Sequence, residues 1–427
     1  MEIQSLHQHF LASTSICTDT RKIIQGCMFV ALKGDNFDAN TFAAKALEMG
    51  AKYVVIDNEE YKFGNETILV NDSLIALQQL ANFHRRYLGL PVIALTGSNG
   101  KTTTKELINV VLSKKYNVVA TVGNLNNHIG VPLTLLSFTK ETEIGIVEMG
   151  ANHQKEIELL CEIAEPNFGY ITNFGKAHLE GFGGVEGVIK GKSELYDYLA
   201  KNTKTAFINL DDPIQEEKTA ALPRYTFATD NYNCDVRVES VEANPMVTVK
   251  VNDVTIQSNL IGIYNAPNIS AAVTIGSYFK VSDAKIKDAI QNYIPANNRS
   301  QLMEKNGRKI ILDAYNANPS SMTAAIANFA QIDGISKLAV LGDMFELGVE
   351  SLEEHKNIVD LVNDQDKIDV IFVGHDFYAN RTENPNLQFF QSYDSFRESY
   401  KEFDKVYDTL LIKGSRGMAL ERTLDMI

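Results

Sequence analysis

The 427-residue sequence predicts an α/β protein of three domains, and three observations support this fold class. A chain of this length exceeds what one hydrophobic core usually organises, so two or three domains are expected. Short apolar runs alternate with segments of helical periodicity along most of the chain, which is typical of βα units. Many of these runs are apolar at nearly every position, and this favours parallel strands that helices cover on both faces.

The first domain is predicted to span residues 1–88 as a small α/β unit. Its segments alternate along the chain, with strands expected at 28–32, 53–56 and 68–70 and helices at 42–49 and 73–87. Alternation of this kind predicts a small sheet with helical cover.

The central domain, residues 89–296, has more regular apolar runs and indicates a mostly parallel sheet. Its strands are predicted at 92–95, 118–120, 145–148, 168–172 and 206–209. Residues 246–251 and 254–256 are instead typical of an antiparallel hairpin, because Asn252 and Asp253 can form a two-residue turn between them. We expect this hairpin at the edge of the sheet.

The third domain is predicted to span residues 297–427. A polar segment, 294–300, breaks the helical pattern of residues 283–293 and marks the boundary. A new βα series follows, and each strand ends in a glycine, aspartate or lysine-glycine turn. Its strands are predicted at 309–312, 338–341, 370–373 and 410–412. The series indicates a Rossmann-like domain.

Composition and charge exclude several classes of function. Hydrophobic residues make up 44% of the chain without a long apolar segment, so membrane insertion is not expected. The start lacks the pattern of a secretion signal, and we expect the cytoplasm. A formal net charge of −14 disfavours nucleic-acid binding. The four cysteines are far apart with no CxxC spacing, which argues against disulfides and a zinc site.

The segment TGSNGKTTTKE, residues 96–106, lies between an apolar run and a helical pattern. A strand that enters a glycine-rich turn and then a helix directs several backbone N–H groups at one point, which suits a phosphate. Lys101 supplies a positive charge to the outer phosphates, and Thr102 offers a hydroxyl to magnesium. The strict P-loop pattern requires glycine at Leu95, so the segment matches the shorter form GxxGKT.

A P-loop alone leaves open a switch, a motor, a kinase or a ligase. Further motifs make the chain resemble the Mur ligase family across all three domains, beginning with TGSNGKTTTKE, which is similar to the ATP loop of that family. The other matching stretches are VEMGANHQ (147–154), NFGKAHLEGFGG (173–184), GKSELY (191–196), GIYNAPNISAA (262–272), DAYNANPSSM (313–322), LGDMFELG (341–348) and LIKGSRG (411–417).

Within that family the motifs resemble the member that joins D-alanyl-D-alanine to UDP-N-acetylmuramoyl-tripeptide. The resemblance implies an ATP-dependent, ADP-forming carbon–nitrogen ligase of cytoplasmic peptidoglycan precursor synthesis, with Mg²⁺. ATP would phosphorylate the tripeptide carboxylate, and the dipeptide amine would attack the acyl phosphate. The partners implied are these small molecules, and we expect a monomer.

The resemblance also implies residues for ATP and catalysis. The ATP contacts would be Gly97, Ser98, Asn99, Gly100, Lys101, Thr102, Thr103, Asn265, Asn268, Arg299 and Asp313. The catalytic residues would be Lys101, Glu148, His178 and Lys192, and the magnesium ligands Thr102, Glu148, His178 and a carbamylated Lys192. Glu148 ends an apolar strand at the sheet edge where ligands of open α/β sheets collect. Lys190 is the alternative register for the carbamate.

The resemblance implies two further substrate sites. The UDP-muramoyl-peptide contacts would be Thr20, Arg21, Thr121, Asn124 and Asn127. The contacts to D-alanyl-D-alanine would be Asn316, Asn318, Asp343, Lys413 and Arg416, because an arginine suits a free carboxylate and an aspartate an ammonium. Residues 38–40 are Asp-Ala-Asn where the family usually has Asp-Gly-His, so the histidine position is a departure.

Each implied residue has a plainer alternative. Glu148 and Asp313 could be solvated carboxylates at strand ends, Lys192 a surface helix lysine, and Asn265 a helix cap. At the level of function, a diamino-acid-adding Mur ligase typically carries DNP[RA], which is absent here, and folylpolyglutamate synthase usually has its P-loop nearer the N-terminus. A nucleotide-dependent switch or binding module is the alternative from a different class.

Overall fold

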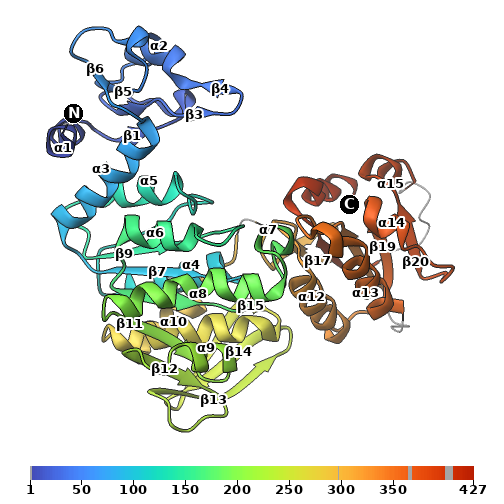
Figure 1. Ribbon diagram of the computed structural model, residues 1–427. Helices are drawn as coiled ribbons and strands as arrows, with labels where there is room; N and C mark the ends of the chain where they lie inside the picture. The colour runs from blue at the N-terminus through green and yellow to red at the C-terminus, as the bar shows by residue number, and fades with distance from the viewer. Residues whose placement is uncertain (1, 297, 364–367, 400–406) are drawn as a thin grey trace.

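The computed structural model describes residues 2–296, 298–363, 368–399 and 407–427. Its strands form a four-stranded, a nine-stranded and a six-stranded sheet, with a separate two-stranded ribbon. In Figure 1 the N-terminal sheet lies above the central one, and the C-terminal sheet lies beside it. No helix in the described ranges is long and apolar enough to cross a bilayer. Asn297, in the predicted linker, falls outside the described residues.

The N-terminal sheet is parallel throughout, in the strand order β1-β2-β5-β6. Its region contains α1 (Ile3–Leu11), β1 (Ile16–Cys17), β2 (Met28–Val30), β3 (Lys33–Gly34), β4 (Phe37–Asp38), α2 (Ala43–Glu48), β5 (Tyr53–Ile56), β6 (Thr67–Leu69) and α3 (Ser73–Leu88). Helix α3 begins after Asp72, whose carboxylate accepts the Ile75 N–H, and it ends at Gly89 in a left-handed conformation. It packs on the central helices α5 and α6 and so carries the N-terminal sheet.

The central sheet confirms the predicted parallel arrangement. Its order is β15-β14-β13-β12-β11-β10-β7-β9-β8, and adjacent strands are parallel from β8 to β13. Its strands are β7 (Val92–Thr96), β8 (Val118–Ala120), β9 (Ile144–Glu148), β10 (Phe168–Ile171), β11 (Thr205–Asn209), β12 (Arg224–Ala228), β13 (Val236–Ala243), β14 (Met246–Val251) and β15 (Val254–Ile261). Its helices are α4 (Lys101–Leu112), α5 (Gly130–Leu136), α6 (Glu156–Ala164), α7 (Leu179–Phe182), α8 (Val185–Lys201), α9 (Pro213–Lys218), α10 (Ala266–Tyr278) and α11 (Asp283–Gln291).

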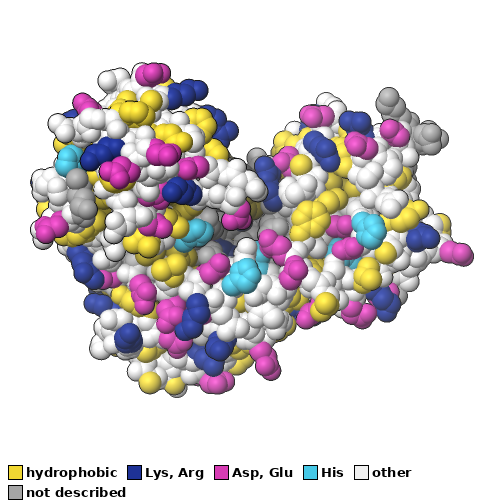
Figure 2. Space-filling view, turned by 45° about the horizontal axis from the view of Figure 1, so that its top comes forward, with side chains coloured by type: hydrophobic (Ala, Val, Ile, Leu, Met, Phe, Trp, Pro, Cys, Tyr) yellow, Lys and Arg dark blue, Asp and Glu magenta, His cyan; other side chains and the backbone are white. Residues whose placement is uncertain are grey.

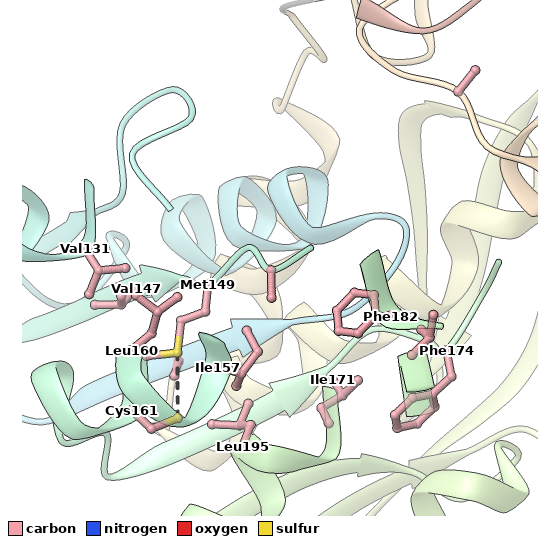
Figure 3. Close-up of a cluster of buried hydrophobic side chains, with 14 of the residues drawn as sticks. Val131, Val147, Met149, Ile157, Leu160, Cys161, Ile171, Phe174, Phe182 and Leu195 are labelled. Carbon is pink, nitrogen blue, oxygen red and sulfur yellow. Dashed lines mark hydrogen bonds between the residues drawn. The ribbon is translucent and has the colours of Figure 1, made fainter. Parts of the chain in front are cut away.

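Helices on both faces explain why the central strands are apolar at every position. In β7, Val92 and Ala94 belong to the core under α5, α6 and α8, whereas Ile93 and Leu95 belong to the core under α4 and α10. Figure 3 shows the first of these cores, where side chains of β9, α6 and α8 interdigitate and Cys161 Sγ contacts Met149 Sδ at 3.9 Å. All four cysteines lie in described ranges and are free thiols.

The predicted hairpin is present at the sheet edge. Strands β14 and β15 are antiparallel, and Val251 pairs with Val254 across a two-residue turn. Asn252 and Asp253 have φ values of 49° and 60°. Positive φ at both central residues is the signature of the turn that matches the twist of a hairpin.

The C-terminal sheet has the strand order β16-β17-β21-β18-β19-β20, parallel except for the β16–β17 pair. Its elements are β16 (Gln301–Lys305), β17 (Arg308–Asp313), α12 (Pro319–Gln331), β18 (Lys337–Gly342), α13 (Ser351–Asn363), β19 (Asp369–Val373), α14 (His375–Ala379), β20 (Leu387–Phe390), α15 (Tyr393–Ser399) and β21 (Thr409–Lys413). Strand β21 lies between β17 and β18, so the order reverses there, and ligands of open α/β sheets bind at such points. The predicted boundaries after residues 88 and 296 fall between the sheets.

Candidate active site

A cavity of about 820 Å³ lies where the central and C-terminal domains meet. Figure 2 shows the hollow between the two lobes of the molecule. Residues of both lobes line it, from the P-loop, the ends of β9 and β17, the start of α10 and the segment before α12. Most of the predicted ATP-binding and catalytic residues are brought together here. The predicted residues on its wall are Ser98, Asn99, Gly100, Lys101, Thr102, Thr103, Asn124, Asn127, Glu148, His178, Asn265, Asn268, Arg299, Asp313, Asn316, Asn318 and Lys413.

The P-loop connects β7 to α4 at the floor of the cavity. Gly97 has φ 137°, and a Cβ there would lie 2.0 Å from Thr172 Oγ1, so glycine is required by space as well as by conformation. Gly100 has φ 78° and directly precedes α4. Lys101 Nζ donates to the carbonyls of Gly97, at 2.7 Å, and Ser98, at 3.2 Å. Burial lowers the pKa of Lys101 from its ordinary value.

Glu148 lies beside the P-loop, because β9 pairs with β7 and brings Glu148 opposite Leu95. Its side chain is 1% exposed. One carboxylate oxygen, Oε1, accepts the Asn126 amide at 2.9 Å. The other, Oε2, is buried and has no hydrogen-bond partner among the described residues. A buried carboxylate oxygen without a donor favours a cation at this point, so the alternative of a solvated carboxylate is wrong.

Lys192 occupies the buried face of α8 and not the protein surface. Its side chain is fully buried, Nζ donates to the Ala151 carbonyl at 3.0 Å, and Nζ lies 4.8 Å from the centre of the Phe182 ring. Burial, reinforced by the charge of Lys101, holds the Lys192 pKa well below its ordinary value. Lys190 is exposed. The cavity itself is lined by Ala151, so Lys192 lies directly behind its wall.

The two asparagines predicted to read adenine form a hydrogen-bonded chain. Asn265 donates to the Ile261 carbonyl at 2.8 Å and accepts the Asn268 amide at 2.8 Å. Asn268 in turn accepts the Thr104 hydroxyl at 3.0 Å. Asn265 precedes α10, but in the described part of the chain its side chain caps no helix N–H, so the capping alternative is wrong. The chain fixes both carboxamides against the P-loop helix.

The C-terminal domain contributes a charged group across from the P-loop. Lys413 Nζ donates to Asp313 Oδ2 at 2.6 Å and to the Asn316 carbonyl at 3.3 Å. The guanidinium of Arg299 stacks on the Tyr315 ring, with its carbon 3.6 Å from the ring centre. Asp313 also accepts the Ser300 N–H at 3.1 Å. Asp313 is therefore a paired carboxylate and not a free surface charge.

Asn318 faces the P-loop, where we predicted a contact with D-alanyl-D-alanine. Its side-chain Nδ2 donates to Asn99 Oδ1 at 2.7 Å. Its side-chain Oδ1 caps α12 by accepting the Ser321 N–H at 2.9 Å. Asn99 also donates to Ser320 Oγ at 3.1 Å. The start of α12 is thus hydrogen-bonded directly to the phosphate loop.

Three predicted substrate contacts of the central and C-terminal domains lie outside the lining of the cavity, and their roles stay predictions. Thr121 is buried, and its hydroxyl accepts the Glu148 N–H at 3.0 Å, so it supports Glu148. Asp343 accepts the N–H groups of Asp376 and Phe377 at the start of α14. Arg416 is 60% exposed at its side chain and pairs with Glu421 at 2.6 Å.

The oxygen and nitrogen atoms around Asp343 are already satisfied. His355 Nε2 accepts the Met344 N–H at 2.9 Å, and its Nδ1 donates to the Ser351 carbonyl at 2.7 Å. Asp376 accepts the Ser351 hydroxyl at 2.5 Å. Although these carboxylates and the imidazole lie close together, their contacts make them a structural anchor for the ends of β18 and β19.

Thr20 and Arg21 lie in the N-terminal domain, outside the lining of the cavity between the other two domains. Arg21 is exposed and pairs with Asp19 at 2.8 Å. This pairing lowers the pKa of Asp19 to about 2. Their predicted role toward the UDP group stays a prediction.

Sequence reasoning missed two residues of the site. Asn126, which donates to Glu148, lies between the predicted Asn124 and Asn127. The asparagine-rich segment was therefore recognised, but Asn126 itself was not given a role. Glu346 contacts His178 Nδ1 from the C-terminal domain. Its motif, LGDMFELG, also marked the segment, but the pairing of two residues 168 positions apart leaves no local pattern.

A phosphate loop that faces a second α/β domain across one cavity defines a multidomain P-loop protein. Comparison with known proteins gives the family. Residues 95–276 match the Mur ligase middle domain, and residues 298–416 match the Mur ligase glutamate ligase domain. The chain belongs to the Mur ligase family.

Individual relatives are similar over nearly the full chain. The UDP-N-acetylmuramoyl-tripeptide–D-alanyl-D-alanine ligase of Bacillus subtilis is 36% identical over 95% of this chain and 91% of its own length. The crystal structure of MurF from Acinetobacter baumannii superposes with a TM-score of 0.87 at 31% identity, covering 99% of this chain and 97% of that one. The MurF ligase of Thermotoga maritima, solved in complex with ADP, superposes with a TM-score of 0.84 at 27% identity, covering 98% and 97%.

Proposed function

We propose that this protein uses ATP to join D-alanyl-D-alanine to UDP-N-acetylmuramoyl-tripeptide, forming ADP, phosphate and an amide bond. The relatives that match nearly the whole chain carry this activity in their names. One structural observation carries the proposal: the P-loop and the strand ends of the C-terminal domain line the same cavity. ATP held on one wall and the dipeptide amine held on the other can therefore both reach the tripeptide carboxylate.

The phosphate end of the cavity is built to hold ATP. The N–H groups of the P-loop and the start of α4 present partial positive charge, and Lys101 adds a full one toward the transferred phosphoryl group. ADP in the related Thermotoga structure supports the choice of nucleotide. Asn265 and Asn268 would meet the adenine, and Asp313 the ribose. Arg299, stacked on Tyr315, would contact phosphate.

The residues present fit a magnesium ion. Glu148 Oε2 is buried without a donor, and Thr102 lines the cavity at the first turn of α4. Carboxylate and hydroxyl oxygens are the ligands that this ion prefers. When bound, magnesium would neutralise charge on the transferred phosphoryl group. Asn126 and Thr121 keep Glu148 in place, through its carboxylate and its backbone N–H respectively.

We propose that Lys192 carries a carbamate. Burial holds its pKa well below the ordinary value, which favours the neutral amine. The neutral amine adds to carbon dioxide, forming an N–C bond and releasing one proton, and the lysine becomes an anion. An anion here, behind Ala151, would add negative charge beside the metal ligands.

The chemistry needs positioning more than an enzyme nucleophile. The tripeptide carboxylate oxygen attacks the γ-phosphorus of ATP and ADP leaves, so an acyl phosphate forms. The dipeptide amine then attacks the acyl carbon, phosphate leaves, and the amine loses a proton. Asn316 and Lys413 lie on the cavity wall where the dipeptide would enter, and Asn124 and Asn127 where the muramoyl peptide would. Closure of the C-terminal domain over the cavity would exclude water, which would otherwise hydrolyse the intermediate.

Mass spectrometry of the reaction products tests the proposal. The protein is incubated with ATP, magnesium, D-alanyl-D-alanine and UDP-muramoyl-tripeptides containing either lysine or diaminopimelate. We expect the mass of the tripeptide plus the dipeptide minus water, with ADP released in equal amount and only when both substrates are present. ATP hydrolysis that is independent of D-alanyl-D-alanine, with no new peptide, would instead support a nucleotide-dependent switch.

A further inference from the structure

His178 and Glu346 form a contact between two domains at the edge of the cavity. His178 Nδ1 is hydrogen-bonded to Glu346 Oε2, and Figure 1 shows α7, which follows His178, beside the C-terminal domain. Both residues have left-handed backbone conformations, with φ 54° for His178 and φ 63° for Glu346. Residues other than glycine rarely adopt this backbone conformation, and those that do are often found at functional sites. The contact therefore has features of a functional arrangement.

The loop that carries Glu346 is held from both sides. From the C-terminal domain, His355 Nε2 accepts the Met344 N–H at 2.9 Å, and Ser415 Oγ accepts the Phe345 N–H at 2.9 Å. From the central domain, the Glu180 N–H donates to the Glu346 carbonyl at 3.3 Å. These bonds fix the backbone on which the carboxylate stands.

The contact determines which imidazole nitrogen carries the proton. A carboxylate only accepts hydrogen bonds, so His178 donates through Nδ1–H and the lone pair of Nε2 stays available. Metal-binding and catalytic histidines are commonly oriented by a carboxylate on the second nitrogen.

We propose that Glu346 is a positioning residue for the ligation reaction: it fixes the tautomer and orientation of His178, and it does so only when the C-terminal domain is docked. This inference rests on the proposed function and on the role in catalysis and magnesium binding that the family resemblance implies for His178. Because the two partners belong to different domains, the hydrogen bond that orients His178 forms only when the two domains are docked. Docking of the C-terminal domain, which carries the predicted dipeptide contacts, would thereby orient His178 beside the phosphate loop of the central domain.

The competing explanation is a docking contact that leaves His178 unaffected. Glu346 is 52% exposed at its side chain, and Lys176 and Glu354 form a second ion pair across the same interface. A measurement on the imidazole itself separates the two explanations, because only the positioning role predicts a change in the protonated nitrogen.

Proton–nitrogen NMR of histidine-labelled full-length protein makes that measurement, at a pH where imidazoles are neutral. His178→Gln identifies the His178 signals. We expect the Nδ1–H tautomer in the wild-type protein and a shift of at least half the population toward Nε2–H in Glu346→Ala. Glu353→Gln, which removes an exposed charge from the first turn of α13, should leave the His178 signals in place. Unchanged His178 signals in Glu346→Ala would overturn the inference.

Kinetics then test whether the positioning matters. Glu346→Ala should lower kcat about 10- to 100-fold with little change in the KM for ATP, the usual effect of removing a carboxylate that orients such a histidine. Glu346→Gln, which keeps an acceptor, should lose less. The double variant with His178→Ala should be no slower than His178→Ala alone. If His178→Ala loses ligation and Glu346→Ala does not, the inference is wrong and the proposed function stands. If His178→Ala ligates normally, the proposed role of His178 is wrong, and the inference with it.

Discussion

At the scale of single residues, burial decides which polar groups can act. Glu148 and Lys192 are both inside the protein, and each keeps an unusual chemical state there: an oxygen with no donor among the described residues and an amine whose pKa is lowered. The sequence predicted both residues from motif resemblance. Their burial, on which the proposed magnesium and carbamate roles rest, followed only from the packing of β9 and α8.

Replacement of Lys101 by alanine should abolish ligation without unfolding the protein. The lysine lies at the loop tip and donates to loop carbonyls, so it contributes charge to the phosphate site more than packing to the core. We expect kcat to fall about 100-fold or more, with an unchanged circular dichroism spectrum and a cooperative melt. Near-normal ligation by the folded variant would show that Lys101 and its loop do not bind the transferred phosphate.

Lys192→Ala should inactivate the enzyme, and added acetate or another small carboxylate should restore part of the activity as its concentration rises. The added anion would replace the carbamate that the variant cannot form. Lys190→Ala is the matched control: Lys190 is exposed on the same helix, and exposed substitutions usually change stability by within about 0.5 kcal/mol. An active Lys192→Ala variant, or one that no carboxylate rescues, would contradict the carbamate.

At the scale of elements, the backbone turns that the sequence encodes locally were the easiest to predict. The turn at Asn252 and Asp253 is specified by two residues that tolerate positive φ, and the hairpin formed where expected. The strands β12, β13, β16 and β20 were missed because polar residues interrupt their apolar positions, and the two-residue strands β1, β3 and β4 were too short to give a pattern. Strand β16 alternates between half-buried and exposed positions at the sheet edge, so its five residues carry no apolar run.

Asn252→Val should destabilise the hairpin without affecting the site. A β-branched residue at φ 49° costs about 1–2 kcal/mol relative to a residue that tolerates the left-handed region. The free energy of unfolding, measured by urea titration, should fall by about that amount while kcat stays unchanged. Thr255→Val, at an exposed position of β15, is the control and should be nearly neutral. Equal stability of both variants would mean that the turn does not limit the hairpin.

At the scale of the whole molecule, the three-domain α/β fold was predictable and the contacts between domains were not. Each sheet arises from local alternation of strands and helices, whereas Asn99–Asn318 and His178–Glu346 join residues more than 160 positions apart. The same limit applies to the predicted dipeptide contacts Asp343 and Arg416, which lie outside the lining of the cavity. Their motifs were recognised, but the direction of each side chain depends on tertiary packing.

The joint between the N-terminal and central domains should make stability depend on pH. His7 Nε2 and His84 Nδ1 are 3.0 Å apart, and His84 Nε2 donates to the Phe138 carbonyl at 2.9 Å. Burial, with the neighbouring His84, lowers the His7 pKa from 6.5 to about 4. The unfolded chain therefore binds more protons between these values, and stability should fall as pH falls through that window.

Urea midpoints measured from neutral pH down to pH 4 check this dependence. The wild-type midpoint should be constant above pH 6.5 and decrease below it, as the pKa of His7 requires. His7→Gln, which can still donate to His84, should show a shallower decrease because one of the buried imidazoles is gone. Parallel curves for the two proteins would show that His7 does not cause the dependence.

The most direct test of the whole account follows an oxygen atom through the reaction. The tripeptide is labelled with ¹⁸O in its free carboxylate and incubated with ATP, magnesium and D-alanyl-D-alanine. If the carboxylate is phosphorylated and phosphate then leaves the acyl carbon, one labelled oxygen must pass from the peptide to the released phosphate. We predict phosphate that carries a single peptide-derived ¹⁸O, in amounts equal to the amide formed. Unlabelled phosphate, with its new oxygen taken from water, would contradict ligation through an acyl phosphate.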